Sequence, residues 1–220
     1  MDVIQAGIGI GIGAMVVGAG CLLWGMRFKD RGAYTPRPQP GQLYGAWDEL
    51  AYWDPLPHAR ELCEENAIGG GRWEDRGRLN VPGPFYCGRT GGEGRGALFA
   101  PWHVLRDESG AEFVYRQPAD PVELRAVVTA AWSDPAGGYA WDGDRRWTPE
   151  SVRAWWAGRG GVRDWIGERL AEPEREAGER ESLRDFAAYL DDGLEDDLRG
   201  YLFWLIEGRE PGLYEELPKL

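Results

Sequence analysis

An uncharged stretch near the N-terminus constrains this chain more than any other feature. The 24 residues Val3–Met26 contain no charged side chain, and Gln5 is the only strongly polar residue among them. A helix of about 20 apolar residues is long enough to cross the hydrocarbon core of a bilayer. Glycine, which is frequent in this stretch, is more common in membrane helices than in soluble ones. We therefore predict that residues 1–31 form one transmembrane helix with a basic flank.

Charged residues around the stretch predict its orientation. Arg27, Lys29 and Arg31 follow it, with Asp30 among them, whereas only Asp2 precedes it. Positively charged flanks stay on the cytoplasmic side of a membrane. The preference for Arg over Lys in the whole chain is typical of a GC-rich bacterial genome. We therefore expect a single-pass protein of the bacterial inner membrane with its C-terminal domain in the cytoplasm.

The glycines of the predicted helix form a regular stripe. Small residues recur at steps of three or four and share one helix face: Gly7, Gly11, Ala14, Gly18, Cys21 and Gly25. Such a face lets two helix backbones approach closely, which favours a homo-oligomer or docking on another membrane protein. A helix that contacts only lipid is the alternative. The segment Gly9–Ala14 also matches a dinucleotide-binding motif, but that motif requires a βαβ unit, and a proline-rich linker follows here.

Cleaved or lipidated leaders fit the N-terminus less well. A secretory signal peptide has its basic residues before a shorter apolar core, which is the reverse of this arrangement. The segment Val17–Cys21 places small residues before a cysteine, as a lipoprotein signal does. However, the apolar run continues through Trp24, past the point of cleavage. A membrane helix therefore remains the expectation.

The chain is strongly acidic. Its formal net charge is −12, and residues 171–220 hold 15 acidic and 6 basic side chains, a net of −9. Such a surface repels the phosphates of a nucleic acid, so nucleic-acid binding is disfavoured. The charge either keeps the domain soluble or forms an acidic face for a basic protein partner.

A linker and one domain follow the membrane helix. Residues 32–45 hold three prolines and show no apolar periodicity, which predicts a semi-extended linker. Residues 46–220 are expected to form a soluble α+β domain, in which a small antiparallel sheet packs against a mostly helical C-terminal half. Aromatic and branched residues predict short strands at Phe85–Cys87, Ala97–Leu105 and Glu112–Gln117.

Three helix starts are indicated by a capping residue followed by proline. Asp54, Asp120 and Thr148 each precede a proline, which suits the first position of a helix. In the second of these helices, Trp132 is expected to face inward with its apolar neighbours. Tyr139–Trp147 is expected to form a tight hairpin around its Asp-Gly pair.

Several segments of the domain are similar to a known group of proteins. They are VPGPFY (81–86), EFVYRQP (112–118), GGYAWDGD (137–144), WTPESVRAWW (147–156) and residues 183–208. Through these segments, residues 80–210 resemble uncharacterised actinobacterial proteins that are sometimes labelled ferredoxins. The resemblance implies no established activity. A cysteine often stands in that group where this chain has Trp141, so the resemblance implies no thiol chemistry at this position.

The cysteines and histidines do not have the spacing of a metal site. An iron–sulfur cluster needs four ligands, typically cysteines, and this chain has three, of which Cys21 lies in the predicted membrane helix. A site built from His58, Cys63, Cys87 and His103 has neither Rieske nor zinc spacing. Three sparse cysteines also do not resemble a disulfide framework. We predict no metal and no cofactor.

Two further patterns resemble parts of a catalytic triad and of an anion-binding loop. His103, Asp107 and Ser109 would form a nucleophilic triad only if the fold brought them together. Gly88–Gly96 is a glycine-rich loop with two arginines, which could touch an anion, but it lacks the GK[ST] ending of a phosphate loop. A flexible connection is the simpler interpretation.

Tryptophan is concentrated in one short region, within twenty-five residues from Trp141 to Trp165. Most of these indoles are expected in the core, but the adjacent Trp155 and Trp156 cannot both point inward. Exposed aromatic residues ringed by acids are typical of protein-recognition surfaces. The predicted binding face consists of Trp141, Trp147, Trp155, Trp156, Glu195 and Asp196.

The sequence as a whole predicts a membrane-anchored, non-enzymatic module of the immunity-protein or adaptor kind. Its acidic, tryptophan-rich domain would bind a basic protein. The alternative is a redox or metal-dependent enzyme that uses Cys87, His103 and the turn with Asp142 and Asp144. That turn resembles a fragment of a calcium loop without the later ligands.

Overall fold

The structure is a computed structural model, which describes residues 52–63, 70–90 and 94–220. These residues belong to one unit, Pro36–Leu220. The predicted membrane helix and linker lie outside the described residues, and so does the stripe of Gly7, Gly11, Ala14, Gly18, Cys21 and Gly25. Within the described part, no helix combines the length and the apolar character needed to span a bilayer.

The described residues form an α+β fold, as predicted. The helices are α2 (Leu56–Leu62), α3 (Gly96–Phe99), α4 (Pro121–Ser133), α5 (Pro149–Ala157), α6 (Arg159–Ala171), α7 (Ala177–Asp191) and α8 (Leu194–Glu207). The strands are β1 (Tyr86–Cys87), β2 (Val104–Arg106), β3 (Glu112–Val114) and β4 (Tyr139–Ala140), and two 3-10 turns are η1 (Trp73–Asp75) and η2 (Gly143–Arg145). The C-terminal half is mostly helical, as expected.

The strands form two antiparallel pairs, β1 with β4 and β2 with β3. The fully buried side chain of Asn80 links the two pairs. Its Oδ1 accepts the backbone N–H groups of Cys87 at 2.8 Å and of Val114 at 3.0 Å. Its Nδ2 donates to the carbonyl of Cys87 at 3.0 Å. A side-chain amide therefore supplies the hydrogen bonds that an additional strand would supply between β1 and β3.

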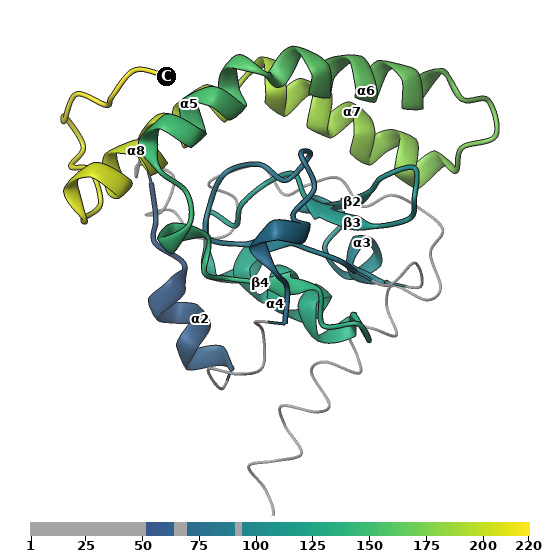
Figure 1. Cartoon of the computed structure of the whole chain (residues 1–220), viewed down its shortest axis with the longest axis horizontal. Coiled ribbons are helices and arrows are strands. Elements are labelled where there is room, and N and C mark those ends of the chain that lie inside the picture. The colour runs from purple at the N-terminus through teal and green to yellow at the C-terminus, as the bar shows by residue number, and fades with distance from the viewer. Residues whose placement is uncertain (1–51, 64–69, 91–93) are drawn as a thin grey trace, which may run out of the picture. The chain divides into compact units, whose positions relative to one another are not determined.

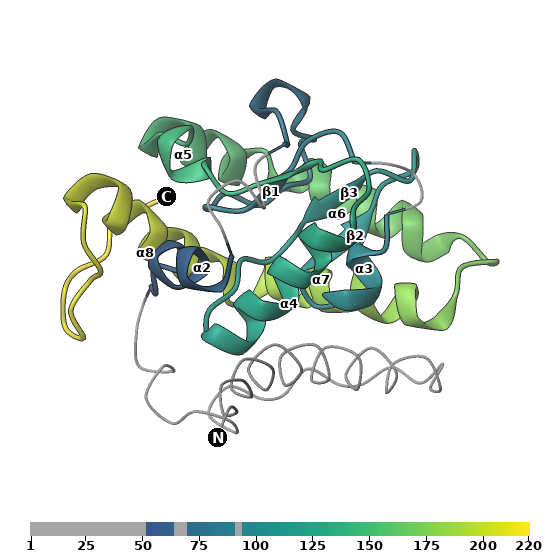
Figure 2. The same cartoon turned by 90° about the horizontal axis from the view of Figure 1, so that it is seen from below.

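The strands separate two hydrophobic cores. Leu105 and Phe113 are paired across β2 and β3 and belong to the first core, which contains the buried residues of α5–α8. Val104 and Val114 are also paired and belong to the second core, with α2 and α4. Figures 1 and 2 show α5–α8 on one side of the strands and α3 and α4 on the other. The alternation of side chains along β2 and β3 fills both cores.

Two of the three predicted helix caps are present. Asp120 accepts the backbone N–H groups of Val122 and Glu123 at the start of α4. Thr148 forms a capping box with Ser151 at the start of α5. Asp54 is not the cap of α2, because Pro55 occupies that position, although the Asp54 carboxylate accepts the N–H of Leu56 at 3.0 Å. These local signals fix helix starts because they satisfy N–H groups that have no partner within the helix.

Three further local predictions were wrong. Ala97–Leu105 is not one strand, because Gly96–Phe99 forms α3 and β2 does not begin until Val104. Trp132 does not face inward but is 52% exposed. Tyr139–Trp147 is not a hairpin, because β4 pairs with β1 and the Asp-Gly pair continues into η2. Gly143 packs so closely that an added Cβ would lie 2.1 Å from the carbonyl oxygen of Gly83.

Candidate functional site

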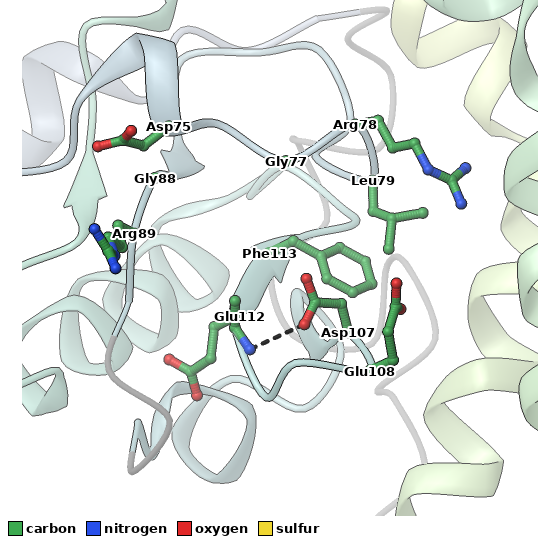
Figure 3. Close-up of a pocket in the computed structure, with 11 residues that line it drawn as sticks. Asp75, Gly77, Arg78, Leu79, Gly88, Arg89, Asp107, Glu108, Glu112 and Phe113 are labelled. Carbon is green, nitrogen blue, oxygen red and sulfur yellow. Dashed lines mark hydrogen bonds between the residues drawn. The ribbon is translucent and has the colours of Figure 1, made fainter.

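A cleft of about 410 Å³ lies beside the β2–β3 hairpin. Its lining comes from three separate segments and consists of Asp75, Gly77, Arg78, Leu79, Gly88, Arg89, Asp107, Glu108, Ala111, Glu112 and Phe113. Figure 3 shows Asp107 and Glu108 close to Phe113 on one side of the cleft, with Asp75 and Arg89 on the other. The cleft therefore has charged walls, and Phe113 behind them belongs to the core and is 2% exposed.

The acidic wall is held by the hairpin turn and by α6. Asp107 Oδ1 accepts the backbone N–H groups of Ser109 at 2.8 Å and of Ala111 at 3.0 Å. Glu108 accepts the indole N–H of Trp165 at 2.9 Å. This hydrogen bond lowers the pKa of Glu108, which is therefore ionised at neutral pH. Hydrogen bonds thus hold both Asp107 and Glu108 in place on this wall.

Glu112 forms a buried part of the lining and is 2% exposed. Its carboxylate accepts the hydroxyl of Tyr139 at 2.9 Å and the backbone N–H of Ala97 at 3.2 Å. The guanidinium Nε of Arg106 lies 3.6 Å from it. Because these groups already surround the carboxylate, Glu112 supports the cleft and is not available to a ligand.

Two arginines border the cleft. The indole N–H of Trp155 donates to the carbonyl of Arg78 at 3.0 Å, and the Arg78 guanidinium reaches the carbonyl of Gly161 at 3.4 Å. Arg89 is exposed. Asp75, Asp107 and Glu108 outnumber the two arginines in the exposed part of the lining. Arg72 lies 3.9 Å from Asp75, and Arg169 adds a positive charge near Glu108.

The structure distributes the predicted binding residues over several places. Trp155 adjoins the cleft through its hydrogen bond to Arg78. Trp156 is half-buried, and the Arg159 guanidinium lies 3.8 Å from the centre of its ring. The tryptophan side of the predicted face therefore meets the cleft at Trp155.

None of the six predicted binding residues is part of the cleft lining, and the other four lie elsewhere in the domain. Trp147 is 5% exposed and packs in the first core, where its ring meets that of Trp73 edge to face and the Arg76 guanidinium lies 4.1 Å from its ring centre. Trp141 is half-buried against the second core. Glu195 and Asp196 are exposed on the first turn of α8. The six predicted residues therefore do not form one surface around the cleft.

The residues of the alternative enzyme have different partners. Cys87 and His103 are both fully buried. Burial raises the pKa of the Cys87 thiol well above its usual range, and the charge of Glu112 raises it further. His103 Nδ1 lies 3.1 Å from the carbonyl of Arg116. None of these contacts of Cys87 and His103 involves the turn with Asp142 and Asp144.

The two aspartates of that turn point to separate groups. Asp142 accepts the hydroxyl of Tyr86 at 2.7 Å and the Nε–H of Arg146 at 2.9 Å. Asp144 accepts the hydroxyl of Tyr201 at 2.9 Å. Among the described residues, no group of three or more His, Cys, Asp or Glu side chains is placed to hold a metal ion.

The sequence did not indicate most of the residues that line the cleft. It indicated a possible anion contact at the arginines of Gly88–Gly96, but it gave no role to Asp75, Arg78 or Glu108. These residues are far apart in the chain and follow no motif, so no local signal identifies them.

No protein-family model, curated protein or solved structure matches this chain. The similarity to the actinobacterial group therefore remains a prediction.

Proposed function

We propose that this protein is a membrane-anchored, non-enzymatic binding module whose cytoplasmic domain binds a basic protein. The anchor is the apolar stretch Val3–Met26, and its basic flank supports the cytoplasmic orientation. An immunity-type protein or an adaptor has this organisation. The observation that carries the binding role is the acidic wall of the cleft, Asp107 and Glu108, next to Phe113.

The cleft suits a lysine or arginine side chain of the partner. An arriving cation would meet Glu108 in its ionised form. Charge-assisted hydrogen bonds to a carboxylate are stronger than neutral ones. The net charge of −12 favours the approach of a basic partner over longer distances. Trp155 at the edge of the cleft adds aromatic surface of the kind that contributes strongly to protein interfaces.

The test uses the full chain in lipid nanodiscs and a fluorescein-labelled peptide of nine arginines, followed by fluorescence polarisation. The double variant Asp75→Asn, Glu108→Gln removes two charges of the cleft and keeps the hydrogen-bond acceptor for Trp165. We expect its affinity to fall about tenfold, because each charge near a surface contributes on the order of 0.5–1 kcal/mol. A peptide of nine glutamates should not bind.

A matched variant separates the cleft from a general acidic surface. Glu195→Gln, Asp196→Asn removes the same charge from the exposed first turn of α8. We expect this change to alter the affinity less than about twofold. Equal losses in the two double variants would show that the peptide follows overall charge, and a larger loss at α8 would move the binding face to that helix.

The anchor has an independent test. A reporter enzyme that is active only in the cytoplasm, fused after Leu220, should be active, and the fusion should sediment with the membrane fraction. A fusion found in the soluble fraction would contradict the anchor without affecting the cleft.

A further inference from the structure

A buried carboxylate lies where the described domain begins. Asp144, in η2, accepts the hydroxyl of Tyr201 from α8 at 2.9 Å through Oδ1. Its other oxygen, Oδ2, is shielded from solvent and has no hydrogen-bond partner. A buried carboxylate oxygen without a partner is costly in its ionised form, since neither water nor a donor stabilises the charge. Protonation of Asp144 removes that cost.

The segment Tyr52–Asp54 lies against the same part of α8. The ring of Tyr52 lies 5.7 Å from that of Tyr201 and 6.2 Å from that of Trp204, measured between ring centres. The hydroxyl of Tyr52 is also buried without a hydrogen-bond partner. The backbone N–H of Asp54 donates to the carboxylate of Glu210 at 2.9 Å. Aromatic packing and one hydrogen bond thus hold this segment in place.

The charges around Asp144 are mixed. Burial raises its pKa to about 7, the Tyr201 hydroxyl opposes this change, the Asp54 carboxylate adds to it, and Arg60 of α2 opposes it. Glu210 adds a negative charge near Tyr52 and Asp54. The phenols of Tyr52 and Tyr201 are neutral at physiological pH, because burial raises the pKa of both well above the usual range.

The basic neighbours in the chain do not neutralise Asp144. Arg146 pairs with Asp142, with 2.9 Å between its Nε and the carboxylate Oδ2. Arg145 is exposed. Ionised Asp144 therefore adds a buried negative charge close to Asp54.

We propose that Tyr52–Asp54 is a proton-controlled latch, which protonated Asp144 keeps closed on α8 and ionised Asp144 releases. Everything that precedes Tyr52 in the chain, including the predicted membrane helix, joins the domain through this segment. Release of the latch frees Tyr52–Asp54 from α8. The inference rests on Asp144 and its neighbours and does not depend on the proposed role of the cleft.

Hydrogen–deuterium exchange of the full chain in nanodiscs tests the latch between pH 4.5 and 8.5. The amides of Asp54 and Leu56 are the reporters, because both donate within the closed segment. At each pH the exchange rate of the wild type is divided by that of Asp144→Asn, so that the intrinsic pH dependence of exchange cancels. The ratio should rise by up to about tenfold per pH unit from about pH 4 and level off near pH 7.

The amides of α6 and the variant Asp54→Asn distinguish release of the latch from a general loosening of the domain. Amides of α6, Arg159–Ala171, should keep a constant ratio over the whole range. Asp54→Asn removes a charge that repels ionised Asp144, so the exchange rate should stop rising at a lower pH than in the wild type. This variant provides an independent test if Asp144→Asn disturbs folding. A constant ratio at Asp54 and Leu56, or an equal rise in α6, would overturn the proposal.

Discussion

The side-chain amide of Asn80 hydrogen bonds to both backbone groups of Cys87, accepting its N–H at 2.8 Å and donating to its carbonyl at 3.0 Å. The same Oδ1 also accepts the N–H of Val114. Two strand pairs whose strands are each only two or three residues long are thereby joined. Short pairs of strands are marginally stable on their own, so this connection is important for the domain.

Replacing Asn80 with alanine should therefore destabilise the domain strongly. Asn80→Ala leaves the N–H groups of Cys87 and Val114 buried without acceptors, and each unsatisfied group costs about 1–3 kcal/mol. We expect the free energy of unfolding in urea to fall by about 3–5 kcal/mol. Thr129→Ala on the outer face of α4 serves as the control and should change it by less than about 0.5 kcal/mol. Similar values for the two variants would mean that Asn80 does not join the strand pairs.

The cap of α5 gives a smaller and more local prediction. Thr148→Ala removes the side chain that accepts the N–H of Ser151, and it should lower the free energy of unfolding by about 1 kcal/mol. Thr148→Ser retains the hydroxyl and should recover most of that loss. Urea denaturation of the two variants measures the difference, and an equal loss in both would show that the hydroxyl has no capping role.

Asp144 should make the stability of the domain depend on pH in an unusual direction for a carboxylate. Its pKa is about 7 in the folded domain and 3.8 as a free side chain, so the folded state binds the proton more tightly. The resulting stabilisation is complete below about pH 4 and is lost as the pH rises to about 7. Relative to Asp144→Asn, the free energy of unfolding should fall by up to about 1.4 kcal/mol per pH unit in this window. A constant difference between the two proteins from pH 4 to pH 8 would contradict the pKa of about 7.

Cys87 should be unreactive in the folded protein. Its thiol is fully buried, and burial raises its pKa, so little thiolate is present and none is accessible. Alkylation by iodoacetamide at pH 7.5, followed by mass spectrometry, should be at least about 100-fold slower in buffer than in 8 M urea. Rapid labelling of Cys87 in buffer would instead favour the alternative of a redox enzyme.

The sequence was most informative where short-range chemistry decides the structure. The caps at Asp120 and Thr148 were predictable because they depend on a few neighbouring residues. The inward positions of Leu124 and Val127 followed from helical periodicity, and both side chains are fully buried. Trp132 continued the same pattern but is 52% exposed, although its neighbours Ala130 and Ala131 in the last turn of α4 are buried.

Long-range packing explains most of what the sequence did not reveal. Leu98, Ala100, Trp102 and Val104 alternate as in a strand, but residues 96–99 form a short helix that packs on α4. Tertiary contacts can override such a local pattern over a few residues. Asn80 and Asp144 owe their roles to partners far away in the chain, Val114 and Tyr201, so their burial was not visible in the sequence.

Binding of a basic partner in the cleft is tested most directly by a binding footprint on the full chain. Hydrogen–deuterium exchange is measured in nanodiscs with and without the peptide of nine arginines. We expect slower exchange in residues 75–79 and 107–113, which border the cleft, and unchanged exchange in α8. Protection confined to α8, or none in the two cleft segments at a saturating peptide concentration, would show that the cleft does not bind the peptide.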